Sequence, residues 1–108
     1  MKCAKEVMEQ WKATANKRYQ EDLCEMVDKI TEGLFARAGE GRNDIPCVGV
    51  ETKAIEHGIP GAVLIKMGGE RNYYHTVIWK DLLMVLNSLC YHVNEGYSCH
   101  TITPNPSC

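Results

Sequence analysis

Apolar and polar positions follow a regular pattern in the first third of the chain. The apolar residues recur at steps of three and four, which is the spacing of one face of an α-helix. No proline interrupts the stretch and its first glycine is Gly33, whereas Gly39 and Gly41 together end it. The pattern predicts a helix over residues 4–34, within a helical region over residues 1–38. Its apolar positions are Ala4, Val7, Met8, Trp11, Ala15, Tyr19, Leu23, Met26, Val27, Ile30 and Leu34.

The length of this helix leaves two arrangements open. A helix over residues 4–34 spans about 46 Å, whereas a compact chain of this size is only about 35 Å across. Its apolar stripe also winds around the axis, by about 120° over the whole length. Either the helix breaks near the polar run at 15–22 and folds back as a hairpin, or it continues and its free end packs against another subunit. The second arrangement predicts a homodimer through the N-terminal helix.

Short β-rich runs follow the helical region and are bounded by Pro46, Pro60 and several glycines. Their β-branched and aromatic residues favour the pleated, half-buried surface of a strand. Three runs come in succession, and a fourth lies near the end of the chain. The expected strands lie within residues 45–52, 61–67, 73–79 and 98–103.

A second helix is expected between the third and fourth runs. From Lys80 the apolar period returns to that of a helix, and Gly96 is expected to end it as a left-handed cap. The residues on its apolar face are Leu82, Val85, Leu86, Leu89 and Val93.

This order of elements predicts an α+β fold. It comprises a long N-terminal helix or helical hairpin, a small antiparallel sheet of three to four strands and one C-terminal amphipathic helix. The length favours a single domain over residues 1–108. Within it, residues 1–38 form the helical region, 45–103 the sheet plus helix, and 104–108 a tail.

The charge of the chain argues against polyanionic partners. Its formal net charge is -2, so no global field draws it onto nucleic acid or anionic lipid. The N-terminal segment lacks the apolar core of a signal peptide, and no apolar run approaches a membrane span. We therefore expect a cytoplasmic protein with no membrane partner, and its six cysteines are expected to be free thiols in a reducing compartment.

Two cysteines and two histidines near the C-terminus raise the question of a zinc site. A tetrahedral site commonly takes two ligands from a C-x-x-C knuckle, and neither pair has that spacing. On a helix, Cys90 and His92 would face opposite sides, and on a strand the adjacent Cys99 and His100 would as well. We expect no metal and no cofactor, and we expect one of Cys99 and His100 to face the core.

The stretch that most suggests function combines basic and aromatic side chains around the third strand. Basic groups beside aromatic faces suit a protein partner, a nucleotide or a base. The alternative is that strand alternation places half of these residues in the core. The candidate binding residues are Lys66, Arg71, Tyr73, Tyr74, His75 and Lys80.

The C-terminal third, "VIWKDLLMVLNSLCYHVNEGYSCHTIT", follows the charged N-terminal helix with a strand, a leucine-rich helix, a glycine stop and a last strand. In this organisation the chain resembles small accessory proteins of phages and mobile elements, anti-CRISPR proteins among them. The resemblance implies a non-catalytic inhibitor that blocks a host defence protein, for example a CRISPR-Cas component, by stoichiometric steric binding in the host bacterial cytosol.

Two other function classes remain open at this stage. A small nucleic-acid or nucleotide-binding protein would use the same basic and aromatic residues. A small cysteine-dependent enzyme would need a thiol activated by a nearby base. We expect the chain not to be an enzyme, because none of the motifs GxSxG, HExxH, GxxxxGK[ST] and GxGxxG occurs in it.

Overall fold

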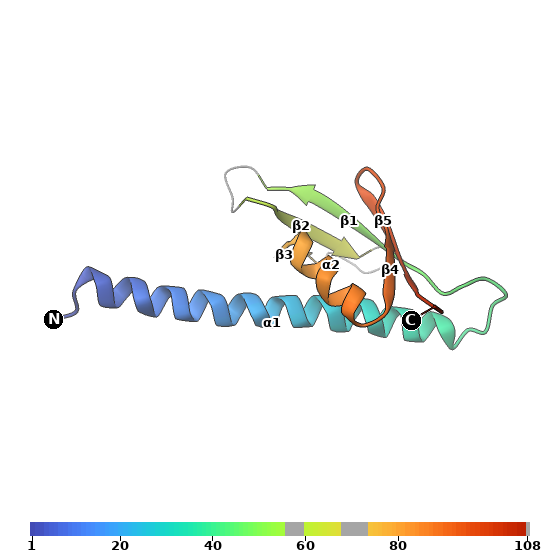
Figure 1. Ribbon diagram of the computed structural model, residues 1–108, viewed down its shortest axis with the longest axis horizontal. Helices are drawn as coiled ribbons and strands as arrows, with labels where there is room; N and C mark the ends of the chain where they lie inside the picture. The colour runs from blue at the N-terminus through green and yellow to red at the C-terminus, as the bar shows by residue number, and fades with distance from the viewer. Residues whose placement is uncertain (56–59, 68–73, 108) are drawn as a thin grey trace.

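The computed structural model describes residues 1–55, 60–67 and 74–107, apart from the side chains of Tyr74 and His75. The fold is α+β, with a long N-terminal helix and a curled antiparallel sheet (Figure 1). Its elements in chain order are α1 (Ala4–Ala38), β1 (Val48–Ala54), β2 (Ala62–Met67), β3 (Tyr74–Ile78), α2 (Trp79–Ser88), β4 (Tyr91–Asn94) and β5 (Cys99–Pro104).

The sheet has the strand order β3-β2-β1-β5-β4, and neighbouring strands pair antiparallel. The central strand β1 pairs Val50 with Met67 of β2 on one side and with His100 of β5 on the other. Because side chains alternate across a strand, this register places these residues on the same face of the sheet. That face carries the core.

The core lies between this face and the two helices. The strands contribute side chains such as Val48, Val50, Ile65 and Ile102, each 0% exposed. Helix α2 adds Leu82 and Leu86 to the same cluster. The buried residues of α1 are Leu23, Met26, Val27, Ile30 and Leu34.

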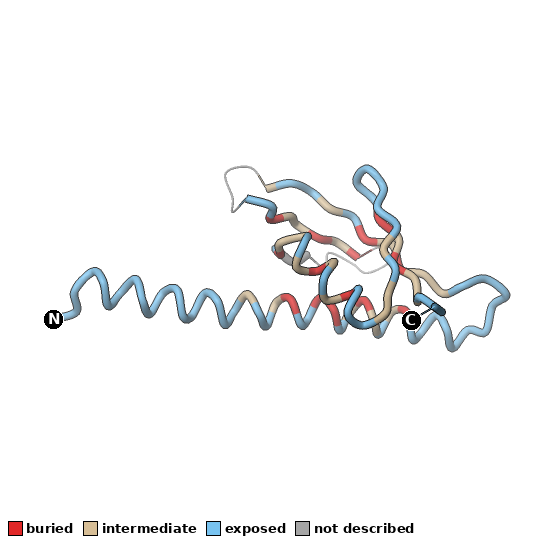
Figure 2. Tube along the Cα trace, viewed as in Figure 1, coloured by how far each residue is buried: buried red, intermediate tan, exposed pale blue. Residues whose placement is uncertain are grey.

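Helix α1 is one unbroken helix of 35 residues, which decides between the two expected arrangements in favour of the continuous one. Residues 19–38, the sheet-bound half, carry every buried residue of the helix, whereas residues 1–18 are all exposed (Figure 2). Residues 4–18, hereafter the arm, therefore project from the body. The molecule measures 64 × 26 × 25 Å along its principal axes.

The expected C-terminal helix is shorter than its apolar period indicates. Helix α2 ends at Ser88, and Cys90 adopts a positive φ of 69°, a backbone conformation that cannot continue a right-handed helix. The chain then forms β4, so the sheet has five strands within the described residues instead of three to four. The expectation that the helix reaches Val93 is wrong.

Gly96 is a loop residue of the β4–β5 hairpin rather than a helix cap. A Cβ atom at this position would lie 2.3 Å from the carbonyl oxygen of Cys99. A glycine is required here because the two backbone segments approach each other so closely.

Candidate docking surfaces

The arm carries three large apolar side chains that no described part of the chain covers. Val7 is 56% exposed, Met8 49% and Trp11 61%. With 3.6 residues per turn, Ala4, Met8, Trp11 and Ala15 fall within about 60° of arc on the helix surface. These residues form an apolar stripe, and an exposed stripe on a projecting element is typical of an interaction site.

The stripe leads into a groove between α1 and the edge strand β3. The groove has a volume of about 520 Å³. Ala15, Arg18 and Asp22 of α1 line one wall, and they continue the face of the arm because each is three or four residues from the next. The other wall is formed mainly by Ala62, Thr76, Val77 and Ile78. Arm and groove thus form one continuous surface.

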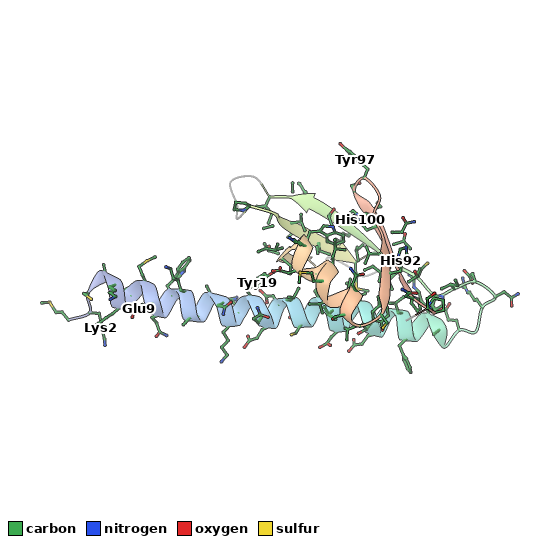
Figure 3. All side chains as sticks on the ribbon, in the orientation of Figure 1. Lys2, Glu9, Tyr19, His92, Tyr97 and His100 are labelled. Carbon is green, nitrogen blue, oxygen red and sulfur yellow. The ribbon has the colours of Figure 1, made fainter. Side chains whose placement is uncertain are left out.

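Tyr19 anchors α1 to the body at the point where the arm begins. Its hydroxyl donates a hydrogen bond of 2.6 Å to Asp81 Oδ2 of α2 and accepts one of 3.3 Å from the backbone N–H of Ile78. Figure 3 shows Tyr19 directed from α1 toward the body, with Glu9 on the arm and Lys2 beyond it near the N-terminus. Burial, the hydrogen bond to Asp81 and the negative charge of that carboxylate raise the pKa of Tyr19 to about 12, although the Ile78 bond opposes this.

The second surface is the face of the sheet opposite the core. No helix of the described residues covers it, since α1 and α2 both pack on the core side. Strand alternation directs Glu51 and Lys53 of β1, Lys66 of β2 and Cys99 of β5 to this face. Glu51 lies directly opposite Lys66 in the register and beside Cys99 on its other side. We call this surface the open face.

The structure describes the side chains of two of the six candidate binding residues, Lys66 and Lys80, and these two lie in different layers. Lys66 lies on the open face, whereas Lys80 is exposed on α2, in the helical layer. Tyr74 and His75 belong to β3 and pair with Lys66 and Ile65 in the register, but their side chains lie outside the described part. Arg71 and Tyr73 also fall outside the described residues. Of this group, the open face holds Lys66 and does not hold Lys80.

His100 is buried, and its ring contacts three different parts of the fold. It is 6% exposed, and its ring lies 4.6 Å from that of Trp79. Nδ1 accepts a hydrogen bond from the Gly96 N–H at 3.2 Å, so Nε2 carries the proton and donates to Thr52 Oγ1 at 2.9 Å. The ring therefore holds the β4–β5 hairpin, β1 and α2 together.

The C-terminal Cys and His residues are dispersed rather than convergent. His100 faces the core and Cys99 is exposed, which confirms that one of the two faces inward. His92 is exposed on β4 (Figure 3). Cys90 is disulfide-bonded, against the expectation of free thiols, whereas Cys3, Cys24, Cys47 and Cys99 are free. Within residues 1–55, 60–67 and 74–107, no three His, Cys, Asp or Glu side chains are placed to hold a metal ion.

Val7, Met8 and Trp11 belong to the predicted apolar stripe of the helix but are not among the candidate binding residues that the sequence predicts. The available signal was the winding of that stripe, because a straight helix with a winding stripe cannot place all of it on one sheet.

Neither α1 nor α2, the helices in the described ranges, is both long and apolar enough to cross a bilayer. No family model, curated protein or solved structure matches the chain.

Proposed function

We propose that this chain is a non-catalytic binding protein, a phage-type inhibitor that occupies the surface of a host defence protein such as a CRISPR-Cas component in the bacterial cytoplasm. The observation that carries the proposal is the open face. A sheet with only one face covered presents a broad and rigid surface, and such a surface suits contact with another folded protein.

The charges of the open face favour a protein partner over a nucleic acid. Lys53 and Lys66 are its basic residues among those described, and Glu51 lies opposite Lys66 in the strand register. A surface that tracks a phosphate backbone needs an unbroken run of positive charge. Lys80, which would extend the positive patch, lies in the helical layer. Mixed charges of this kind match the polar rim of a protein interface.

The polar groups of the described core support a role without catalysis. Tyr19, Asp81, Thr52 and His100 are engaged with one another or with the backbone in bonds that link helix to sheet or strand to strand. A general base or nucleophile must instead be within reach of a substrate. The positions of these four side chains are explained by the hydrogen bonds they make in stabilising the fold.

A plating assay tests the proposal directly. Bacterial strains that each carry one active defence system, CRISPR-Cas systems included, are infected with a targeted phage in the presence or absence of the chain. We expect the chain to restore plating in at least one strain. The double variant Lys53→Glu and Lys66→Glu should lose this effect, since two reversed charges at an interface weaken binding by about tenfold or more.

Lys80→Glu is the control, because it reverses one lysine charge on the helical layer, whereas the double variant reverses two on the open face. It should inhibit like the wild type. If no strain in the panel is protected, the proposed inhibition is wrong. If Lys80→Glu loses the effect and the double variant keeps it, the open face is not the surface that binds.

A further inference from the structure

The arm and the groove have the properties of two halves of one self-complementary interface. The stripe on the arm is apolar and lacks a groove to enter on its own chain, while the groove further along α1 lies on the same side of the helix. We propose that the arm of one copy docks along the groove of a second copy, and that its own groove receives the arm of that copy. The inference goes beyond the proposed inhibition and uses a different surface.

The stripe and the α1 wall of the groove lie on the same side of the helix, which supports this pairing. Ala4, Met8, Trp11 and Ala15 face one way, and Arg18 and Asp22 continue that face to the groove. A helix that lies along the arm therefore also lies over the groove, without any bend in α1. The same straight path serves both copies when the two helices run antiparallel.

One antiparallel register fits side chains by size. With the two-fold axis on the side of the stripe, midway between Trp11 and Ala15 along the helix, Trp11 of each copy lies against Ala15 of the other, so the largest side chain of the stripe meets one of the smallest. Met8 then packs along the aliphatic part of Arg18 of the other copy, at the mouth of the groove. Long basic side chains cover apolar surface in this way while the charged end stays in water.

The same register brings complementary charges together. The first turn of α1 carries Lys5 and the positive end of the helix dipole, while its Glu6 pairs with Lys2 at 3.9 Å on the side of the helix away from the stripe. In the antiparallel pair this turn reaches Asp22 of the other copy, which lines the groove on the side of the stripe. The attraction acts twice, once at each end of the pair.

A second copy is the occupant that uses both features at once. A two-fold interface joins the same patch on both subunits, so each contact between arm and groove is made twice and the buried area doubles. An arm of this length is also only marginally helical when isolated in water. Packing against a second arm supplies the tertiary contacts that stabilise it.

Native mass spectrometry and sedimentation velocity of the full chain at micromolar concentration test the docking. We expect a dimer for the wild type and a monomer for Trp11→Glu, whose charge would be buried in the interface. Phe35→Glu is the matched control, because Phe35 is 82% exposed at the other end of α1 and lies outside the stripe. It should remain a dimer.

A swap of side chains tests the register itself. Trp11→Ala and Ala15→Trp should each weaken the dimer about tenfold or more, by loss of a contact or by a clash. The double variant that carries both substitutions again sets a large side chain against a small one across the interface, and it should recover the dimer. A wild-type monomer, or a dimer that survives Trp11→Glu, would overturn the docking. The plating assay does not depend on these results, because its variants lie on the open face.

Discussion

The two halves of α1 have the same kind of sequence and opposite environments. Both repeat apolar residues at steps of three and four, yet Ile30 is 0% exposed in the sheet-bound half and Trp11 is 61% exposed in the arm. Helical periodicity therefore determines the element and the side of the helix that is apolar. It does not determine what that side packs against, which depends on where the sheet ends.

The largest expected effect comes from removing a buried side chain in the sheet-bound half. Ile30→Ala should lower the free energy of unfolding by about 2–5 kcal/mol, because it removes buried methyl groups and leaves a cavity. Met8→Ala in the arm should change it by no more than about 0.5 kcal/mol. Urea denaturation at a dilution where the chain is monomeric measures both. Equal losses would show that the arm also packs against the body within one chain.

An intermediate effect is expected at Tyr19, where the two halves meet. Tyr19→Phe keeps the ring but removes the hydroxyl that bonds to Asp81 and to the Ile78 N–H. We expect a loss of about 1–2 kcal/mol in the free energy of unfolding, since two polar groups lose a partner. Urea denaturation near neutral pH measures it. A variant as stable as the wild type would mean that the bond does not fix the start of the arm.

The smallest effect concerns the alkaline limit of stability. In the unfolded chain Tyr19 loses its proton near its ordinary pKa of 10.0, but in the folded chain only near about 12. Deprotonation therefore favours unfolding between these values, so the contribution of Tyr19 is complete below pH 10 and is lost as the pH rises to about 12. Unfolding curves across this range should show a steeper loss for the wild type than for Tyr19→Phe. If both proteins lose unfolding free energy equally over this pH range, the pKa of Tyr19 is not raised in the folded chain.

Much of the fold follows from local sequence pattern. The helix from Ala4, the strands β1, β2, β3 and β5, and the start of α2 all lie where periodicity and turn residues predict them. These elements are identified because their apolar spacing and their bounding glycines and prolines agree. The continuity of α1 did not follow from the pattern, since a polar run at 15–22 allows a break as well as an exposed helix.

The misassigned strand β4 shows where pattern fails. Leu86, Leu89 and Val93 keep a helical spacing across Cys90, so the period continues past the true end of the helix. The break is a single residue in the left-handed region, and that residue is not the glycine that usually marks one. The open face was not predictable either, because the separation of Lys66 from Lys80 depends on which layer each element joins.

Helix α1 also has a mechanical consequence. An unbroken helix is rigid along its axis. The length of α1 therefore sets the distance between the dimer interface on the arm and the sheet on the other half of the helix. In the proposed pair, an axis midway between Trp11 and Ala15 separates the two bodies by about 40 Å, at about 1.5 Å per residue along both helices. Two identical open faces at a fixed spacing form a bivalent ligand, and the second contact then occurs at a high effective concentration. A target that itself repeats at that spacing would be held with far greater avidity than either face provides alone.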